Sequence, residues 1–147
     1  VQGQIHKLLR ALVEEEKRSL IMITHSLGVV RELVDRIYVM YAGNIVENCG
    51  TAELFKNPLH PYTQGLLACV PRLSGGGISA GIYGYIPSYV DPPKGCRFFN
   101  RCPHCTERSK QEKPGAYQVA DGHTVSCFLY ENAGKDTTKE EVAEHVE

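Results

Sequence analysis

Apolar residues recur at intervals of three and four positions near the start of the chain. Within residues 4–16 these positions are Ile5, Leu8, Leu9, Leu12 and Val13. The spacing places them on one face of a helix, so it predicts an amphipathic helix with one core-facing side. Residues 19–24 follow with the almost unbroken apolar sequence SLIMIT, which predicts a buried strand. A helix that leads into a buried strand indicates an α/β fold.

Shorter elements are predicted further along the chain. Residues 28–34 have the pattern of a short helix, and the alternating apolar positions of residues 36–41 predict a strand. The tripeptide Ala42-Gly43-Asn44 turns the chain into a second strand over residues 44–48, which completes a β-hairpin. Thr51 is a candidate N-cap for a short helix that continues through Phe55.

The tripeptide His60-Pro61-Tyr62 opens the next predicted helix. Its apolar face comprises Leu66, Leu67 and Val70, and Pro71 ends it. Proline suits the first turn of a helix because the N–H group that it lacks has no helical partner there. The neighbouring tyrosine ring is a packing anchor. We therefore interpret the tripeptide as structural and assign it no chemical role.

Composition divides the chain into four parts. Residues 1–72 form the globular part, and residues 73–94 form a linker rich in glycine and proline. Residues 95–130 hold most of the cysteines, and residues 131–147 form a charged tail with no strong helical pattern. The predicted architecture is an α/β unit followed by a small, irregular cysteine-rich extension.

Overall composition excludes several classes of protein. With 42% hydrophobic and 22% charged residues among 147, the chain is typical of a globular protein. Its net charge of -1 provides no positive field for nucleic acid, so DNA or RNA binding is not predicted. No apolar run is long enough to span a membrane and no signal segment begins the chain, which predicts a cytoplasmic location.

Cysteine spacing marks the strongest candidate site. The extension contains Cys96, Cys102, Cys105 and Cys127. The Cys102-Pro-His-Cys105 sequence lets one loop offer two sulfurs to the same metal centre, as zinc and iron–sulfur sites require. The helices and buried strand predicted for the first half argue against a disulfide scaffold. We interpret the remaining two cysteines, Cys49 and Cys69, as small apolar core residues.

His25 is the second candidate, because it follows directly after the predicted buried strand. The carboxyl edge of an α/β sheet is where such folds bind ligands. On position alone, a histidine there could equally serve as a cap or a hydrogen-bonded structural residue. The surrounding sequence decides between these roles.

Three stretches of the chain resemble one family in the right order. The runs IMITHSLGVV, from Ile21, and DRIYVMYAGNIVE, from Asp35, resemble the switch-histidine segment of ABC transporter ATPases. The run LFKNPLHPYTQGLL, from Leu54, is similar to the ATP-binding subunits of oligopeptide and dipeptide importers. The sequences GCRF, RCP and GHTVSC resemble the end of the C-terminal extension of those subunits.

This resemblance implies a role for His25. As a switch histidine it would contact the γ-phosphate of ATP and help couple hydrolysis to closure of the nucleotide-binding dimer. The chain contains no phosphate-binding loop of the type Gly-x-x-x-x-Gly-Lys-Ser/Thr, so ATP and magnesium are expected only in a full-length subunit. We expect this chain alone to be inactive as an ATPase.

The resemblance also implies partners and a location. The chain would be the C-terminal portion of an ATP-binding subunit that pairs with a second ATPase subunit. The pair would lie on the inner face of the membrane, held there by permease subunits, and would drive the import of short peptides. Related importers in this group carry nickel or sugars, so the resemblance leaves these cargoes open. A stand-alone cysteine-ligated module without ATPase activity is the alternative.

For the cysteines, the resemblance implies a [4Fe–4S] cluster, with zinc as the alternative and metal-free thiols as a third possibility. The family pattern has a cysteine seven residues after Cys102, where this chain has Ser109. We expect Cys105 to supply the fourth thiolate instead. His104 and His123 are left outside the ligand set, because a single histidine is more often a surface or core residue.

Overall fold

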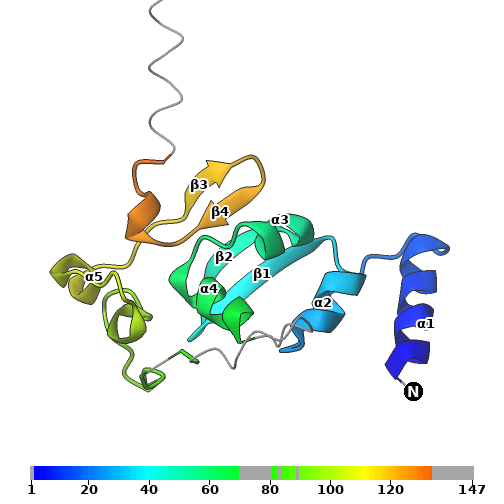
Figure 1. The fold of residues 1–147 in the computed structure, drawn as a ribbon, viewed down its shortest axis with the longest axis horizontal. Coiled ribbons are helices and arrows are strands. Elements are labelled where there is room, and N and C mark those ends of the chain that lie inside the picture. The colour runs from blue at the N-terminus through cyan, green and yellow to red at the C-terminus, as the bar shows by residue number, and fades with distance from the viewer. Residues whose placement is uncertain (1, 70–80, 83, 89, 134–147) are drawn as a thin grey trace, which may run out of the picture. The chain divides into compact units, whose positions relative to one another are not determined.

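The computed structural model describes residues 2–69, 81–82, 84–88 and 90–133 (Figure 1). The chain divides into two compact units, residues 1–35 and residues 36–147, which are described separately here. Within the described residues, no helix is long and apolar enough to cross a membrane.

The first unit contains two helices, as predicted. Helix α1 covers Gln2–Glu14 and helix α2 covers Leu27–Leu33. The side chain of Arg10 donates a hydrogen bond of 2.7 Å to the carbonyl oxygen of Glu32, and so joins the two helices. None of the described side chains in this unit is buried. The apolar faces of its helices are therefore only partly covered.

The strand predicted over residues 19–24 is wrong for this structure. The segment forms no strand pairing, and the side chains of Ile21 and Ile23 are 92% and 98% exposed. A strand needs a neighbour to satisfy its backbone N–H and C=O groups and to cover its apolar side chains. No described segment provides that neighbour.

The second unit begins with the predicted hairpin. Strand β1 covers Arg36–Tyr41 and strand β2 covers Asn44–Gly50. Ala42 and Gly43 join them with φ angles of 46° and 78°, as a tight hairpin turn requires. A bulge between Val39 and Met40 shifts the register.

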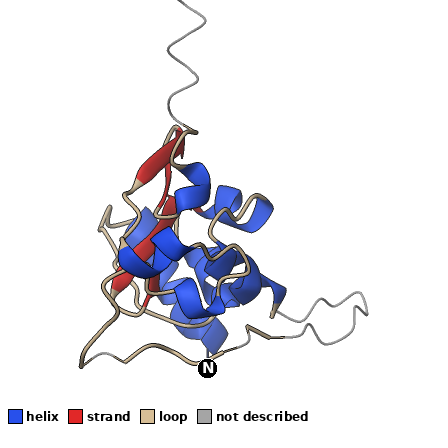
Figure 2. Ribbon diagram, turned by 90° about the vertical axis from the view of Figure 1, so that its left-hand side faces the viewer, coloured by secondary structure: helices blue, strands red, loops and turns tan. Residues whose placement is uncertain are grey.

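The hairpin belongs to a four-stranded antiparallel sheet with the order β1-β2-β4-β3. Its strands are coloured red in Figure 2. Strand β3 covers Tyr117–Ala120 and strand β4 covers His123–Val125. Glu47 of β2 lies opposite Val125 of β4. Residues far apart in the sequence therefore share the centre of one sheet.

Helix α3 covers Thr51–Lys56, and helix α4 covers Pro61–Ala68. Gly50 is the N-cap of α3, so the prediction of Thr51 as its cap is wrong; Thr51 is the first helical residue. His60 caps α4, since its Nδ1 atom accepts a hydrogen bond of 3.0 Å from the N–H of Tyr62. The predicted helix positions Val70 and Pro71 lie outside the described residues.

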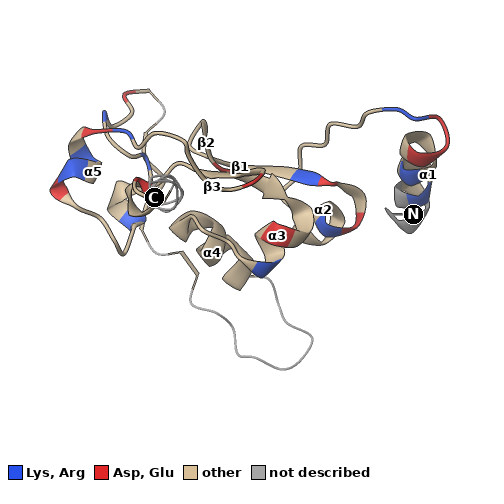
Figure 3. Cartoon of the chain, turned by 90° about the horizontal axis from the view of Figure 1, so that it is seen from above, with Lys and Arg blue, Asp and Glu red and all other residues tan. Residues whose placement is uncertain are grey.

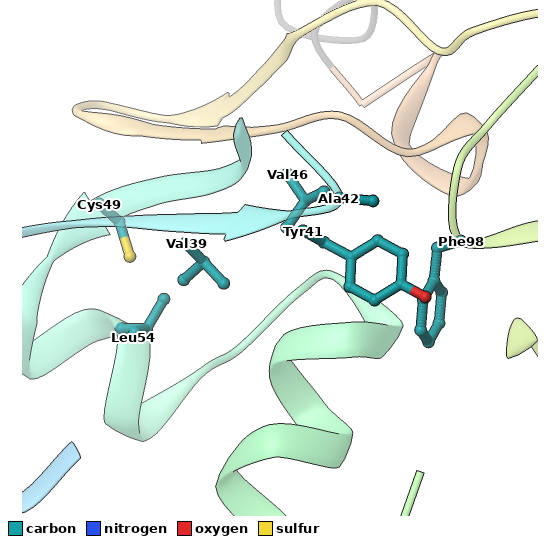
Figure 4. Close-up of a cluster of buried hydrophobic side chains, with 7 residues drawn as sticks. All are labelled: Val39, Tyr41, Ala42, Val46, Cys49, Leu54 and Phe98. Atoms are coloured by element: carbon teal, nitrogen blue, oxygen red, sulfur yellow. The ribbon is translucent and has the colours of Figure 1, made fainter. Parts of the chain in front are cut away.

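A compact apolar core fills the space between the hairpin, α3 and the extension. Figure 4 shows Val39 and Cys49 pointing toward Leu54 of α3, and the rings of Tyr41 and Phe98 in contact. Phe98 comes from the extension and is 2% exposed. Cys49 is fully buried, which confirms its predicted core position. Cys69 is exposed, so the same prediction is wrong for Cys69.

The extension is more regular than predicted. It contains the 3₁₀ turns η1 (Phe99–Arg101) and η2 (Phe128–Tyr130), helix α5 (Glu107–Gln111) and the two strands. Charges of both signs lie on α5 (Figure 3), where Arg108 pairs with Glu112 and, through two contacts of 2.6 and 3.0 Å, with Glu131. Strands β3 and β4 of the extension share a sheet with the hairpin, and Phe98 of the extension packs in the core of the hairpin. The domain boundaries proposed from composition stay predictions.

Candidate functional site

Each of the four cysteines of the extension lies at the end or start of a short element. Cys96 precedes η1, Cys102 follows it, Cys105 precedes α5 and Cys127 precedes η2. Three of them start a tight turn, because their carbonyl oxygens accept a hydrogen bond from the N–H three residues later. The acceptors are Cys96, Cys102 and Cys127, with N···O distances of 3.0, 3.3 and 3.0 Å. All six cysteines of the chain are free thiols.

The charges of the cysteine thiols of the extension act on one another's pKa values. Burial raises the pKa of the Cys96 thiol, and the charge of Cys105 raises it further. Burial also raises the pKa of Cys102, with added contributions from Cys96 and Cys105. The pKa of Cys127 is raised by burial, then by Cys102 and Cys96. Each of the four thiols thus takes part in at least one such charge effect, and their assignment to one site stays a prediction.

Backbone N–H groups point at three of these sulfurs and lower their pKa values, against the effect of burial. The donor lies two residues after each cysteine: Phe98 for Cys96, His104 for Cys102 and Leu129 for Cys127. A hydrogen bond to the charged form favours that form. Burial outweighs these donors, so the pKa of each of the three thiols is raised overall.

A close backbone contact holds Cys96 beside helix α5. Its N–H donates a hydrogen bond of 2.8 Å to the carbonyl oxygen of Ser109. The preceding residue must be glycine, since a Cβ atom on Gly95 would overlap the backbone of Ser109 and Lys110. Ser109 thus lies next to the cysteine group, but its side chain has another role. Its hydroxyl lies 3.0 Å from that of Thr106 in a capping box at the start of α5.

A second buried polar group surrounds Glu47, at the centre of the sheet. Among the described residues, Glu47, Cys49 and His123 form a group whose possible ligand atoms all lie within 4.8 Å of one another.

The carboxylate of Glu47 accepts hydrogen bonds from the N–H groups of Leu59 and His60, at 2.8 and 3.0 Å. It also lies 2.9 Å from the Nε2 atom of His123. With three donors the carboxylate is well satisfied, although Glu47 is only 1% exposed. This group anchors the start of α4 and strand β4 to β2.

Cys49 adjoins Glu47. Burial, with the charge of Glu47, raises the pKa of its thiol to about 11. The hydrogen bonds of Glu47 join three separate segments, which gives this network a structural role. Sequence reasoning did not identify it, although a glutamate on the inward face of a strand was a usable signal. His123 lies in the core and His104 is exposed, and leaving both outside the ligand set stays a prediction.

His25 is exposed, at a bend immediately before α2. The hydroxyl oxygen of the preceding Thr24 accepts a hydrogen bond of 3.0 Å from the N–H of Ser26. His25 belongs to the unit of residues 1–35, whereas the four cysteines of the extension belong to the unit of residues 36–147.

Comparison with known proteins identifies the relatives of this chain. It is 41% identical over 138 residues to the oligopeptide transport ATP-binding protein AppD of Bacillus subtilis, and these residues are 92% of the chain and 42% of that protein. It is 38% identical over 139 residues to the dipeptide transport ATP-binding protein DppD of Escherichia coli, across 93% of the chain and 42% of that protein. The chain therefore spans well under half the length of these relatives.

A family model gives the same result. Residues 46–108 match the C-terminal region of oligopeptide/dipeptide transporters. The matched segment runs from strand β2 through three of the four cysteines to α5. Residues 46–108 thus match the C-terminal region of oligopeptide/dipeptide transporters, and most of the chain is similar to proteins named as ATP-binding proteins of oligopeptide or dipeptide transport.

Proposed function

We propose that this chain is the C-terminal part of the ATP-hydrolysing subunit of a peptide-importing ABC transporter. The carrying observation is its similarity, over 92% of its length, to a relative named as an oligopeptide transport ATP-binding protein. In this role it acts with a second ATP-binding subunit and with permease subunits on the inner face of the membrane, and the cargo is short peptides. The relatives' names do not favour a stand-alone metal module.

His25 is proposed to contact the γ-phosphate of ATP in the assembled subunit. The exposed, strongly apolar segment 19–24 supports this role, because such a sequence becomes a central strand once neighbouring strands cover it. His25 would then lie at the carboxyl end of that strand, where α/β folds bind ligands. ATP and magnesium would be held by a phosphate loop, which this chain does not contain.

Steady-state ATP hydrolysis by the full-length subunit tests this role. We expect His25→Ala to lower kcat by about a hundredfold with little change in ATP affinity, since the interaction strengthens in the transition state. His104→Ala, which removes an exposed histidine in the extension, is the matched control and should leave kcat unchanged. An unchanged kcat in His25→Ala would contradict the role. Residues 1–147 alone should hydrolyse no ATP, because they contain no phosphate loop. Hydrolysis by residues 1–147 would contradict the proposal that ATP and magnesium are held by a phosphate loop outside this chain.

We further propose that Cys96, Cys102, Cys105 and Cys127 hold a [4Fe–4S] cluster. The charge effects between these thiols and the N–H donors at three of the sulfurs support it. Bound there, the cluster supplies covalent cross-links between the turn at Cys96, the Cys102–Cys105 loop and the end of β4. Its role is structural, because these segments contain only short elements. Cys105 replaces the cysteine missing at Ser109.

Anaerobic purification followed by metal and sulfide analysis tests the cluster. We expect about four iron and four sulfide ions per chain, with broad absorbance near 400 nm. Cys105→Ser should lose most of this iron, whereas Cys69→Ser, which changes an exposed cysteine outside the group, should retain it. Stoichiometric zinc without iron would instead support a zinc centre. Full iron in Cys105→Ser would exclude Cys105 as a ligand.

A further inference from the structure

A small pocket lies beside the turn of the β1–β2 hairpin, within residues 36–147. Its volume is about 150 Å³, and its wall includes two cations, Arg97 and Lys113. Among the described residues that line it there is no aspartate or glutamate. Lys113 is exposed and forms no ion pair with another described residue. The pocket is therefore a site of uncompensated positive charge.

Arg97 is held in a defined position with donors to spare. Its Nη1 atom donates a hydrogen bond of 2.6 Å to the carbonyl oxygen of Ala42. Its Nε atom is buried and has no hydrogen-bond partner. A guanidinium is a planar fork of five N–H donors that suits a carboxylate, and one bond to Ala42 leaves Arg97 with donors for a ligand.

The remaining wall limits what can enter. Tyr41, Ile45 and Pro114 contribute apolar surface, while Asn44 and Ser126 contribute polar groups. A cavity of this volume is known to hold a ligand of about six heavy atoms. Such a mixture of apolar wall and few polar groups is typical of a small-molecule site.

From these features we propose that the pocket binds a small monocarboxylate, with the carboxylate between Arg97 and Lys113 and the short apolar part against Tyr41 and Pro114. The ligand is either a free short-chain acid or the C-terminal end of a short peptide, which share this chemistry. The proposal is independent of the ATPase role of His25. Cys96 also lines the pocket, and it is one of the proposed metal ligands. Since bound metal would change the charge beside the pocket, all samples compared must have the same metal content.

The test is a ligand-observed NMR titration of the full chain with sodium propionate. We expect saturable binding that weakens as salt is added, and no binding of propionamide, which has the same shape without the charge. Lys113→Met should weaken binding about fivefold, as loss of an exposed charge contact predicts. Arg97→Met should weaken it more than tenfold. Lys110→Met, which removes an exposed lysine paired with Glu107, should leave binding unchanged.

The outcomes separate the ligand sources. Glycylglycine binding with the same loss in Lys113→Met assigns the site to peptide C-termini, whereas binding of propionate alone assigns it to short-chain acids. Equal binding of propionate and propionamide, no saturable binding, or identical affinity in Lys113→Met overturns the proposal. Binding of inorganic phosphate in place of propionate also overturns it. Because Lys113 is exposed, its variant keeps the test decisive if Arg97→Met fails to fold.

Discussion

At the scale of single residues, the carboxylate of Glu47 joins three separated parts of the second unit. It accepts from Leu59, His60 and His123, so Glu47→Gln replaces one acceptor oxygen with an amide that donates. At least one of the N–H donors of Leu59, His60 and His123 then faces the new amide N–H₂ group in a buried site. We expect the free energy of unfolding to fall by about 3 kcal/mol, measured by urea denaturation.

Glu53→Gln is the matched control for that change. The side chain of Glu53 is 44% exposed and lies 3.9 Å from the Nδ1 atom of His123, a weak contact. Its loss should cost no more than about 0.5 kcal/mol. Equal losses in the two variants would show that the Glu47 network does not anchor the fold.

His60 predicts a pH dependence of stability. Burial lowers the pKa of His60 from 6.5 to about 4, with the charge of Glu47 opposing the shift. Between these values the unfolded chain binds more protons at this site than the folded chain, so stability falls as the pH falls. The contribution is complete above pH 6.5, and about 3 kcal/mol is lost by pH 4.

Urea denaturation between pH 7.5 and 4.5 measures this loss. His60→Asn keeps a good N-cap for α4 but has no titrating ring, so its stability should depend less on pH. The difference between the two pH profiles isolates His60 from the other titrating groups. Parallel profiles would contradict a lowered pKa at this histidine.

At the scale of elements, the sequence pattern predicted the helix and the hairpin that depend on residues close together in the sequence. The helical spacing gave α1, and the Ala42-Gly43-Asn44 turn gave the hairpin, because both depend on residues close in sequence. The failed strand at residues 19–24 has a different cause. Its sequence suits a buried strand, but strand formation requires a partner that the pattern itself does not contain. The pairing of β2 with β4 was missed for the same reason.

The turn before Cys96 depends on one glycine. A Cβ atom at Gly95 would overlap the backbone of Ser109 and Lys110, and backbone atoms cannot move aside as a flexible side chain can. Gly95→Ala should therefore cost about 2 kcal/mol or more and lower the amount of bound metal. Gly115→Ala, where the nearest atoms belong to the Tyr117 ring at 3.6 Å, should leave both quantities nearly unchanged. Wild-type metal content and stability in Gly95→Ala would contradict this tight contact.

At the scale of the whole molecule, the sequence predicted a cysteine site but not the contacts that support the cysteines. The Cys102–Cys105 spacing and the family resemblance predict four ligands, and that ligand set stays a prediction. Their attachment to the hairpin depends on Phe98, which packs against Tyr41 and Tyr62 across long sequence separations. Such contacts leave no local pattern, since each aromatic position alone is compatible with many environments. The extension is therefore part of the core of the second unit.

The division into two units makes a final prediction. No described side chain of residues 1–35 is buried, whereas residues 36–147 contain both apolar clusters. A chain of residues 36–147 should therefore unfold with the same free energy as the full chain, within about 0.5 kcal/mol. Every tyrosine lies beyond residue 35 and there is no tryptophan, so tyrosine fluorescence reports on the second unit alone. Far-ultraviolet circular dichroism of the full chain should show an additional, earlier loss of helix from α1 and α2. A clear loss of stability in the shortened chain would show instead that the first unit supports the second.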